Sequence, residues 1–316
     1  MPPHSEPSIP PPGAPAGAGG PRTSRRSVRV GAVGAAVIAA LAGAAAAAPA
    51  SAVAERPAGY AAEPVRYVAL GDSFSSGPGI PAQTDTTCGR SSSNYPSLVA
   101  EAIGAASFRD VTCAGADTRH MASPQESVPP QLDALRPDTT LVTLGIGGND
   151  LGLAEVITRC VILAGLAPYG SPCKHSYTLL GTDEIGARIN ATAPKIDAVL
   201  DEIHARSPQA TVLLVGYPVL FPDDGTACRE TVDLAVGDFP WIRDKEKHLN
   251  TMLAQQADLN GTTYVDSYAP SVGHDVCTPV GVRWIEPADS AEGAGFHPNA
   301  AGHRSTADAV LGSLKN

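Results

Sequence analysis

Short apolar runs alternate with helix-like segments along most of this chain. Five runs are each four to six residues long and end in a turn rich in glycine or polar residues; they are residues 65–70, 107–112, 140–144, 211–215 and 262–265. Runs of this kind are typical of buried strands. Helical spacing of apolar residues predicts helices at 95–103, 132–135, 183–206, 241–259 and 300–314, with Pro194 expected to kink or end the third.

This alternation predicts an α/β fold, because parallel strands need helical crossovers. The expected architecture is a three-layer α/β/α sandwich around a five-stranded parallel sheet, in one domain. In such folds ligands bind beyond the carboxyl ends of the strands. The turns that follow the strands are therefore where we expect the chemistry.

The first 54 residues are typical of a segment that is processed, not folded. Eight of the first 21 residues are proline, a basic stretch with Arg25 and Arg26 follows, and residues 30–50 are uncharged. Small-residue cleavage patterns end at Ala52 and Ala54. This order predicts a secretory signal peptide, exported by the general or the twin-arginine route, and the alternative is a membrane anchor. The mature domain is then 55–316, a secreted chain of 262 residues with formal net charge −13.

Charge and cysteine usage exclude several functions. The whole chain has a formal net charge of −10, which argues against a nucleic-acid partner because phosphates need basic residues. Six cysteines lie between positions 88 and 277 without a C-x-x-C motif, so disulfides are favoured over a metal or redox site. Six cysteines allow 15 pairings, among which sequential pairing is our hypothesis. We expect no cofactor, no metal, no stable protein partner and a monomer.

Four residues in the predicted turns and in the loop before the last helix have the chemistry of acyl transfer. Ser73 follows the first strand in a glycine-flanked turn, and His297 precedes the last helix, so they are candidates for nucleophile and general base. Gly115 and Asn149 follow the second and third strands. With strand order 2-1-3 these turns are neighbours, so the amides of Ser73, Gly115 and Asn149 could bind an oxyanion.

Each of these residues also has an ordinary structural explanation. Gly-Asp-Ser is a common turn, Gly115 could be a turn glycine, Asn149 could lie in a simple loop, and a single histidine is usually structural. All four in this order are far less expected by chance. A Gly-x-Ser-x-Gly elbow is absent because position 75 is serine, which disfavours the α/β-hydrolase fold.

The chain resembles the GDSL family of the SGNH-hydrolase superfamily, and within it the secreted bacterial lipases and esterases with three disulfides. The resemblance spans about 65–312, and its motifs are Gly71-Asp72-Ser73 with Ser76-Gly77, Gly115, Gly147-Gly148-Asn149-Asp150 and His297-Pro298-Asn299. It implies a flavodoxin-like fold with Ser73 as nucleophile, His297 as base, and Ser73, Gly115 and Asn149 as oxyanion donors. It also implies no metal and the sequential disulfides Cys88–Cys113, Cys160–Cys173 and Cys228–Cys277.

The chain departs from the family pattern at one position. Many members have an aspartate three residues before the histidine, where this chain has Ala294. We therefore expect a Ser–His dyad, with the backbone carbonyl of Ala294 or Gly295 holding the imidazole N–H. Asp289 and Glu292 are the alternative partners of the histidine. Fixing the orientation and tautomer of the ring is the only task such a group has.

The expected function is that of a secreted serine ester hydrolase, a lipase or esterase acting on lipid or simple acyl esters. A polysaccharide acetyl esterase, a phospholipase or an acyltransferase could use the same site, and a non-enzymatic binding module is the remaining alternative. The apolar segment 161–169 is hypothesised to line the acyl pocket or its rim, with a core helix end as the equal alternative.

Overall fold

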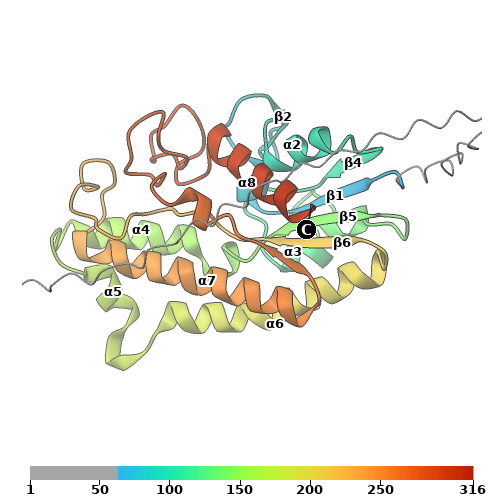
Figure 1. The fold of residues 1–316 in the computed structure, drawn as a ribbon. Helices are drawn as coiled ribbons and strands as arrows, with labels where there is room; N and C mark the ends of the chain where they lie inside the picture. Colours follow the sequence, from blue (N-terminus) through green and yellow to red (C-terminus); the bar gives the residue numbers. More distant parts are fainter. Residues whose placement is uncertain (1–62, 316) are drawn as a thin grey trace, which may run out of the picture. The chain divides into compact units, whose positions relative to one another are not determined.

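The computed structural model describes residues 63–315 (Figure 1). The expected signal peptide and its boundary with the mature domain lie outside these residues. None of the helices in the described part combines the length and the apolar character needed to cross a membrane.

A parallel sheet of five strands forms the centre of the molecule. Its strands are β1 (Arg66–Gly71), β4 (Ser107–Asp110), β5 (Leu141–Gly145), β6 (Thr211–Val215) and β7 (Thr263–Val265). They lie in the order β4-β1-β5-β6-β7, and every neighbouring pair is parallel. Each predicted strand is present, so the predicted sheet is confirmed. In this order the turns after β4, β1 and β5 are adjacent at one edge.

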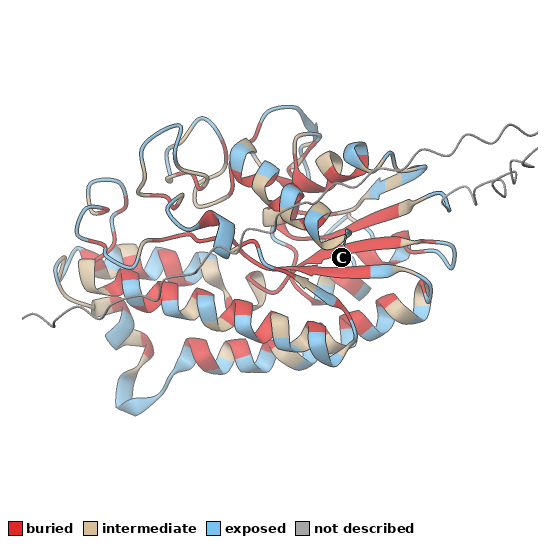
Figure 2. Cartoon of the chain, viewed as in Figure 1, coloured by how far each residue is buried: buried red, intermediate tan, exposed pale blue. Residues whose placement is uncertain are grey.

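Helices cover both faces of the sheet and complete the predicted three-layer sandwich (Figure 1). On one face α2 (Tyr95–Ala102) packs beside α8 (Ala300–Ser313), and their buried side chains meet those of Tyr67 and Leu213 from the sheet. On the other face α6 (Glu184–Arg206) packs beside α7 (Phe239–Leu259), with α4 (Leu153–Ala164) next to them. The buried stripes of α6 and α7 face the sheet, as Figure 2 shows.

Pro194 does not end the third long helix, as the sequence had suggested it could. The helix α6 passes through Pro194 and is 23 residues long in all. Its buried side chains recur at helical spacing on both sides of the proline, from Ile185 and Ile189 to Leu200 and Ile203. This packing outweighs the backbone hydrogen bond that proline cannot donate.

The connections carry short elements and three disulfides. The remaining elements are α1 (Ser73–Ser76), β2 (Gln83–Asp85), β3 (Arg90–Ser91), α3 (Arg119–Ala122), η1 (Gln131–Ala134), η2 (Asn149–Leu151), α5 (Pro172–Tyr177), η3 (Leu179–Gly181), η4 (Val236–Asp238) and η5 (Ala269–Ser271). The disulfides are Cys88–Cys113, Cys160–Cys173 and Cys228–Cys277, which is the sequential pairing. The second links α4 to α5.

Candidate active site

Ser73 is the first residue of the short helix α1, directly after β1. Asp72 caps this helix, because its Oδ1 accepts the backbone N–H of Phe74 at 2.9 Å. Gly71 has φ 155°, and a Cβ there would lie 2.6 Å from the carbonyl oxygen of Gly145. Only glycine fits where β1 and β5 end so close to the turn, and this geometry presents Ser73 at the carboxyl edge of the sheet.

The Ser73 hydroxyl contacts His297. Ser73 Oγ lies 2.8 Å from His297 Nε2, and His297 Nδ1 lies 2.7 Å from the carbonyl oxygen of Gly295. A carbonyl only accepts hydrogen bonds, so Nδ1 carries the proton and Nε2 is left to accept the serine proton. Burial lowers the pKa of His297, while the bond to Gly295 opposes this shift. The imidazole is therefore neutral at neutral pH and able to act as a base.

The sequence offered two backbone carbonyls and two carboxylates to orient the imidazole of His297. The structure shows the backbone carbonyl of Gly295 in contact with the ring. The carbonyl of Ala294 accepts the backbone N–H of His297 at 3.2 Å instead of the ring. Asp289 and Glu292 are exposed and form no hydrogen bond with the ring. Of the two carbonyls expected at the ring, Gly295 and not Ala294 is the partner of Nδ1, and the alternatives Asp289 and Glu292 do not contact it. The backbone turn before His297 places the Gly295 carbonyl at Nδ1.

A buried carboxylate holds the loop that carries His297. The Oε1 of Glu286 accepts a hydrogen bond from Asn299 at 2.6 Å, and its Oε2 accepts from Arg283 at 3.0 Å and Ser290 at 2.6 Å. Burial alone would raise the pKa of Glu286, but the hydrogen bonds from Ser290, Asn299 and Arg283 bring it below its usual value. Asn299 also caps α8, since its Oδ1 accepts the N–H groups at 301 and 302. Loop and helix are thus fixed together.

The loop also docks onto the segment that follows α1. The backbone N–H of Ala294 donates to the carbonyl of Pro78 at 3.0 Å. Gly79, with φ 77°, lies against this loop, and a Cβ there would be 2.7 Å from the nitrogen of Ala294. A larger residue at 79 would push the histidine loop away from the serine turn.

The three expected oxyanion donors lie on adjacent turns. The backbone N–H groups of Ser73 and Gly115 donate to no other residue within 63–315. The side-chain amide of Asn149 donates one hydrogen to the carbonyl of Ala116 at 2.8 Å, which leaves its second hydrogen for a ligand. Asp150 accepts from Thr118 at 3.0 and 2.6 Å, so the turns of Asn149 and Gly115 are linked twice.

Tyr217, which the sequence did not mark as functional, links the other two turns. Its hydroxyl donates to Asp72 Oδ2 at 2.6 Å and accepts the backbone N–H of Gly148 at 2.8 Å. Burial raises the pKa of Asp72 to about 7, although the bond from Tyr217 acts in the opposite direction. Asn250 fixes the tyrosine through its backbone, with bonds of 2.8 and 2.9 Å. The only sequence signal was its place, two residues after β6.

These residues surround a pocket with a cavity volume of about 210 Å³. Ser73, Asn149 and His297 line it together with one face of α4, which includes Leu153 and Ile157. Gly115 lies outside this lining. The segment 161–169 does not reach the pocket either: Val161, with residues 164, 165 and 168, lines a separate hollow. The hypothesis that this segment lines the acyl pocket or its rim was wrong for the pocket beside Ser73 and His297, called the catalytic pocket below, which meets the first two turns of α4. Residues 161–164 are instead the end of α4, as in the alternative of a helix end.

No group of three or more histidine, cysteine, aspartate or glutamate side chains within 63–315 is arranged to hold a metal ion. The chemistry that the described side chains provide is nucleophilic attack by a serine hydroxyl, assisted by a neutral imidazole and by nearby N–H donors.

The chain is similar in sequence and in fold to several known proteins. Residues 69–305 match the model of the GDSL-like lipase/acylhydrolase family. The chain is 41% identical to Lipase 2 of Streptomyces coelicolor over 257 residues, which are 78% of this chain and 85% of that protein. It resembles the crystal structure of phospholipase A1 from Streptomyces albidoflavus NA297 with a TM-score of 0.67 and 32% identity, covering 79% of this chain and 99% of that one. The extracellular lipase of Streptomyces rimosus gives a TM-score of 0.61 and 29% identity, with coverage of 79% and 99%.

Proposed function

The chain belongs to the GDSL-like lipase/acylhydrolase family and is a lipase or esterase, and we propose that it cleaves carboxylic esters through Ser73 with His297 as base. The observation that carries the proposal is the contact of 2.8 Å between Ser73 Oγ and His297 Nε2, with Nδ1 held by Gly295. A carboxylate is not needed to orient His297, because the Gly295 carbonyl already fixes the tautomer of the ring.

In the proposed reaction, Ser73 Oγ bonds to the ester carbonyl carbon while its proton passes to His297 Nε2. The resulting oxyanion is bound by the N–H groups of Ser73 and Gly115 and by the amide of Asn149. The bond to the leaving alcohol breaks, and the alcohol takes the proton from Nε2. Water then attacks the acyl-enzyme, with His297 accepting its proton and returning one to Ser73 as the acid leaves.

Hydrolysis of p-nitrophenyl esters tests this proposal. We expect Ser73→Ala to lower kcat/KM by more than about a thousandfold, because the nucleophile is removed. Ser76→Ala is the matched control: Ser76 lies in the same helix, is buried, and its Oγ has no hydrogen-bond partner among the described residues. Intact-mass detection of an acyl adduct on the wild type, absent from Ser73→Ala, gives a second readout. Full activity of Ser73→Ala would refute the mechanism.

Phospholipids are the second substrate class that we propose. The support is the likeness to a phospholipase A1 at 32% identity over nearly all of that chain. Phosphatidylcholine vesicles, tributyrin emulsion and acetylated xylan, compared at equal ester concentration, would separate phospholipase, lipase and sugar-ester activity. Release of acetate from xylan alone would contradict both lipid proposals.

We also propose that the mature enzyme works outside the cell as a monomer. Three disulfides support an oxidising compartment. Expression of the full chain in an exporting bacterial host, followed by N-terminal sequencing of the culture supernatant, tests export and the cleavage after Ala54. Size-exclusion chromatography of the secreted product tests the monomer.

A further inference from the structure

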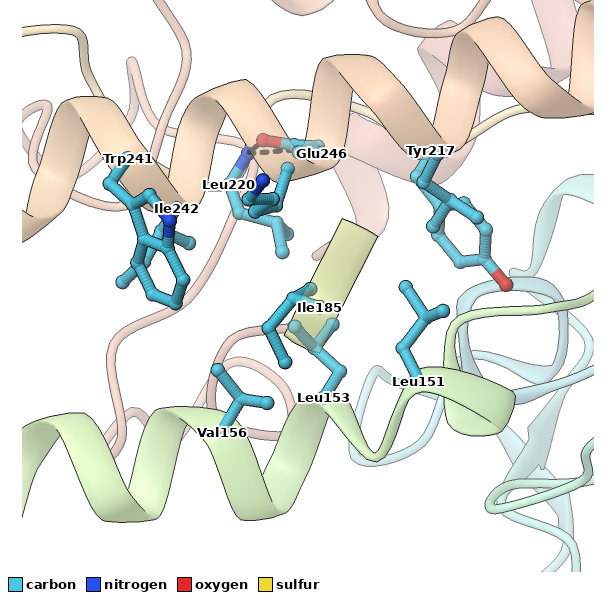
Figure 3. Close-up of a pocket in the computed structure, with 11 residues that line it drawn as sticks. Leu151, Leu153, Val156, Ile185, Tyr217, Leu220, Trp241, Ile242 and Glu246 are labelled. Carbon is cyan, nitrogen blue, oxygen red and sulfur yellow. Dashed lines mark hydrogen bonds between the residues drawn. The ribbon is translucent and has the colours of Figure 1, made fainter. Parts of the chain in front are cut away.

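A second cavity, which shares Leu153 with the catalytic pocket, lies between α4, α6 and α7 (Figure 3). Its walls include Leu153 and Val156 of α4, Ile185 of α6, and Leu249 of α7, with Tyr217 at one end. We call this space the apolar chamber. Its cavity volume is about 40 Å³, room for about three water-sized groups.

Two side chains separate the apolar chamber from the reacting groups. Leu153 lines both the chamber and the catalytic pocket. It is the first residue of α4 and is only half-buried. The other is Tyr217, whose hydroxyl binds Asp72, the residue next to the nucleophile, at 2.6 Å.

The chamber has the chemistry of a site for hydrocarbon. The hydroxyl of Tyr217 is already occupied by Asp72 and Gly148. The carboxylate of Glu246 accepts the backbone N–H of Leu220 at 3.1 and 3.3 Å, a contact drawn in Figure 3, and Lys245 pairs with Asp183 at 2.6 Å.

The indole N–H of Trp241 is the one polar side-chain atom of this lining that is buried without a partner among the described residues. A sugar or a phosphate headgroup would lose its hydration here and gain almost no hydrogen bonds in return.

We propose that the apolar chamber receives the distal methylenes of a straight acyl chain whose ester carbonyl lies at Ser73. This proposal rests on the proposed ester hydrolysis and names the acyl group that the site selects. The carbons nearest the carbonyl occupy the catalytic pocket, and the next few pass Leu153 into the chamber. Each methylene buried there improves binding about fourfold. The enzyme therefore prefers chains longer than butyrate until the chamber is full.

Filling the chamber tests the assignment. Val156→Phe places a ring between α4 and α7, and Val156 is buried at 4% exposure. We expect the ratio of kcat/KM for p-nitrophenyl decanoate to that for the acetate to fall at least tenfold. The matched control is Val199→Phe, at a position that is 6% exposed and lines a different hollow beside α3. It should keep the wild-type ratio. A Val156→Phe ratio within twofold of the wild type would overturn the proposal.

An enlarging variant covers the case in which Val156→Phe does not fold. Leu249→Ala widens the chamber from α7, and we expect the decanoate-to-acetate ratio to rise at least threefold. A ratio that is unchanged or lower in this folded variant would overturn the proposal. Failure of the chamber is distinguishable from failure of the proposed function: in the first case the wild type still cleaves acetate and Ser73→Ala does not, whereas in the second Ser73→Ala stays active.

Discussion

At the scale of single residues, the positioning of the site depends on hydrogen bonds between turns that are distant in sequence. Tyr217 is the clearest case, because one hydroxyl joins Asp72 beside the nucleophile to Gly148 beside Asn149. The distance between Ser73 and the Asn149 amide is therefore set by a residue that the proposed reaction does not involve. Tyr217 is a positioning residue in this sense.

Tyr217→Phe should lower kcat about tenfold to a hundredfold and change KM less than threefold. The variant keeps the ring but leaves Asp72 and the Gly148 N–H without their partner, which costs about 1–3 kcal/mol of stability. Losing this donor raises the pKa of Asp72 above about 7. The folded variant then binds more protons than the wild type, so its stability deficit should grow as pH rises through 7.

Kinetics and urea unfolding between pH 5 and 9 would measure both effects of this substitution. Tyr177→Phe is the control, because the Tyr177 hydroxyl is also buried but has no partner among the described residues. If kcat falls equally in the two variants, loss of any buried tyrosine hydroxyl lowers the activity, and the link from Tyr217 to Asp72 and Gly148 has no special role.

The acidic limb of kcat/KM should have a midpoint below 6.5, the ordinary pKa of histidine. Burial lowers the pKa of His297, so the neutral base persists to lower pH, and activity falls once the imidazole is protonated. Asp72, with a pKa of about 7, is the other group near the site that titrates in this region. If the limb is unchanged in Asp72→Asn, it belongs to His297, whereas its disappearance would assign it to Asp72.

The sequence could predict residues whose neighbours along the chain reveal them. Ser73, Gly115, Asn149 and His297 stand in recognisable turns, and the structure places them on adjacent loops. The role of Tyr217 depends on contacts with residues distant in sequence, which no local pattern encodes. The partners of Glu286 are near in sequence, but the loop that gathers them has no regular pattern. Whether the carbonyl of Gly295 or that of Ala294 contacts the ring of His297 depends on the backbone conformation of one turn, which the residue types there do not determine.

At the scale of elements, the loop between η5 and α8 is held in shape by Glu286. The side chain is fully buried and accepts hydrogen bonds from three residues, among them Arg283 and Asn299. The residue before the histidine, Phe296, has φ 59°, a conformation that a phenylalanine adopts only when its surroundings impose it. Glu286 and its hydrogen-bond partners provide those surroundings, since the backbone N–H of Phe296 donates to the backbone carbonyl of Glu286 at 2.7 Å.

Glu286→Gln should destabilise the protein by about 3 kcal/mol, because the half-buried Arg283 loses its fully buried anionic partner. The hydrogen bonds hold the pKa of Glu286 below its usual 4.5, so the stability it contributes is present above that value and lost as pH falls below it. The difference in the free energy of unfolding between wild type and Glu286→Gln should therefore become smaller below pH 4.5. Urea unfolding at pH 3.5 and 7 measures this.

Glu292→Gln is the control, because Glu292 is exposed in the same loop, and this variant should unfold at the same urea concentration as the wild type. If the free energies of unfolding of wild type and Glu286→Gln differ by the same amount at pH 3.5 and pH 7, the ionised Glu286 side chain does not stabilise the loop.

Strands were easier to predict than helices for a physical reason. The strand β5 is buried along its whole length and β1 is buried from Tyr67 onward, so both are short and mostly apolar runs in the sequence. The helix α4 was missed, because it begins after the glycine-rich turn at Gly152 and its apolar residues face both the core and the catalytic pocket. A helix that lines a cavity lacks the simple one-sided pattern of α6.

At the scale of the whole molecule, three layers place the reacting groups at the carboxyl edge of the sheet, in loops instead of in the core. Loops contribute little burial, and the disulfides supply the constraint. Cys88–Cys113 lies beside the Gly115 turn, Cys160–Cys173 holds the far end of α4, and Cys228–Cys277 joins two long loops. Because two of the bridges join connecting segments and the third joins α4 to α5, the enzyme's stability should depend on its redox environment.

The three closed loops span 13, 25 and 49 residues, so the cost of losing each bridge should increase in that order. The chain-entropy relation gives about 3, 3.5 and 4 kcal/mol for replacing Cys160–Cys173, Cys88–Cys113 and Cys228–Cys277 by alanine pairs. Together these losses are comparable to the whole stability of a typical domain, about 5–15 kcal/mol. Full reduction should therefore unfold the enzyme near room temperature, which urea unfolding with and without dithiothreitol would measure. If the reduced protein unfolds at the same urea concentration as the oxidised protein, packing of the sheet and helices is enough to keep the loops in place without disulfides.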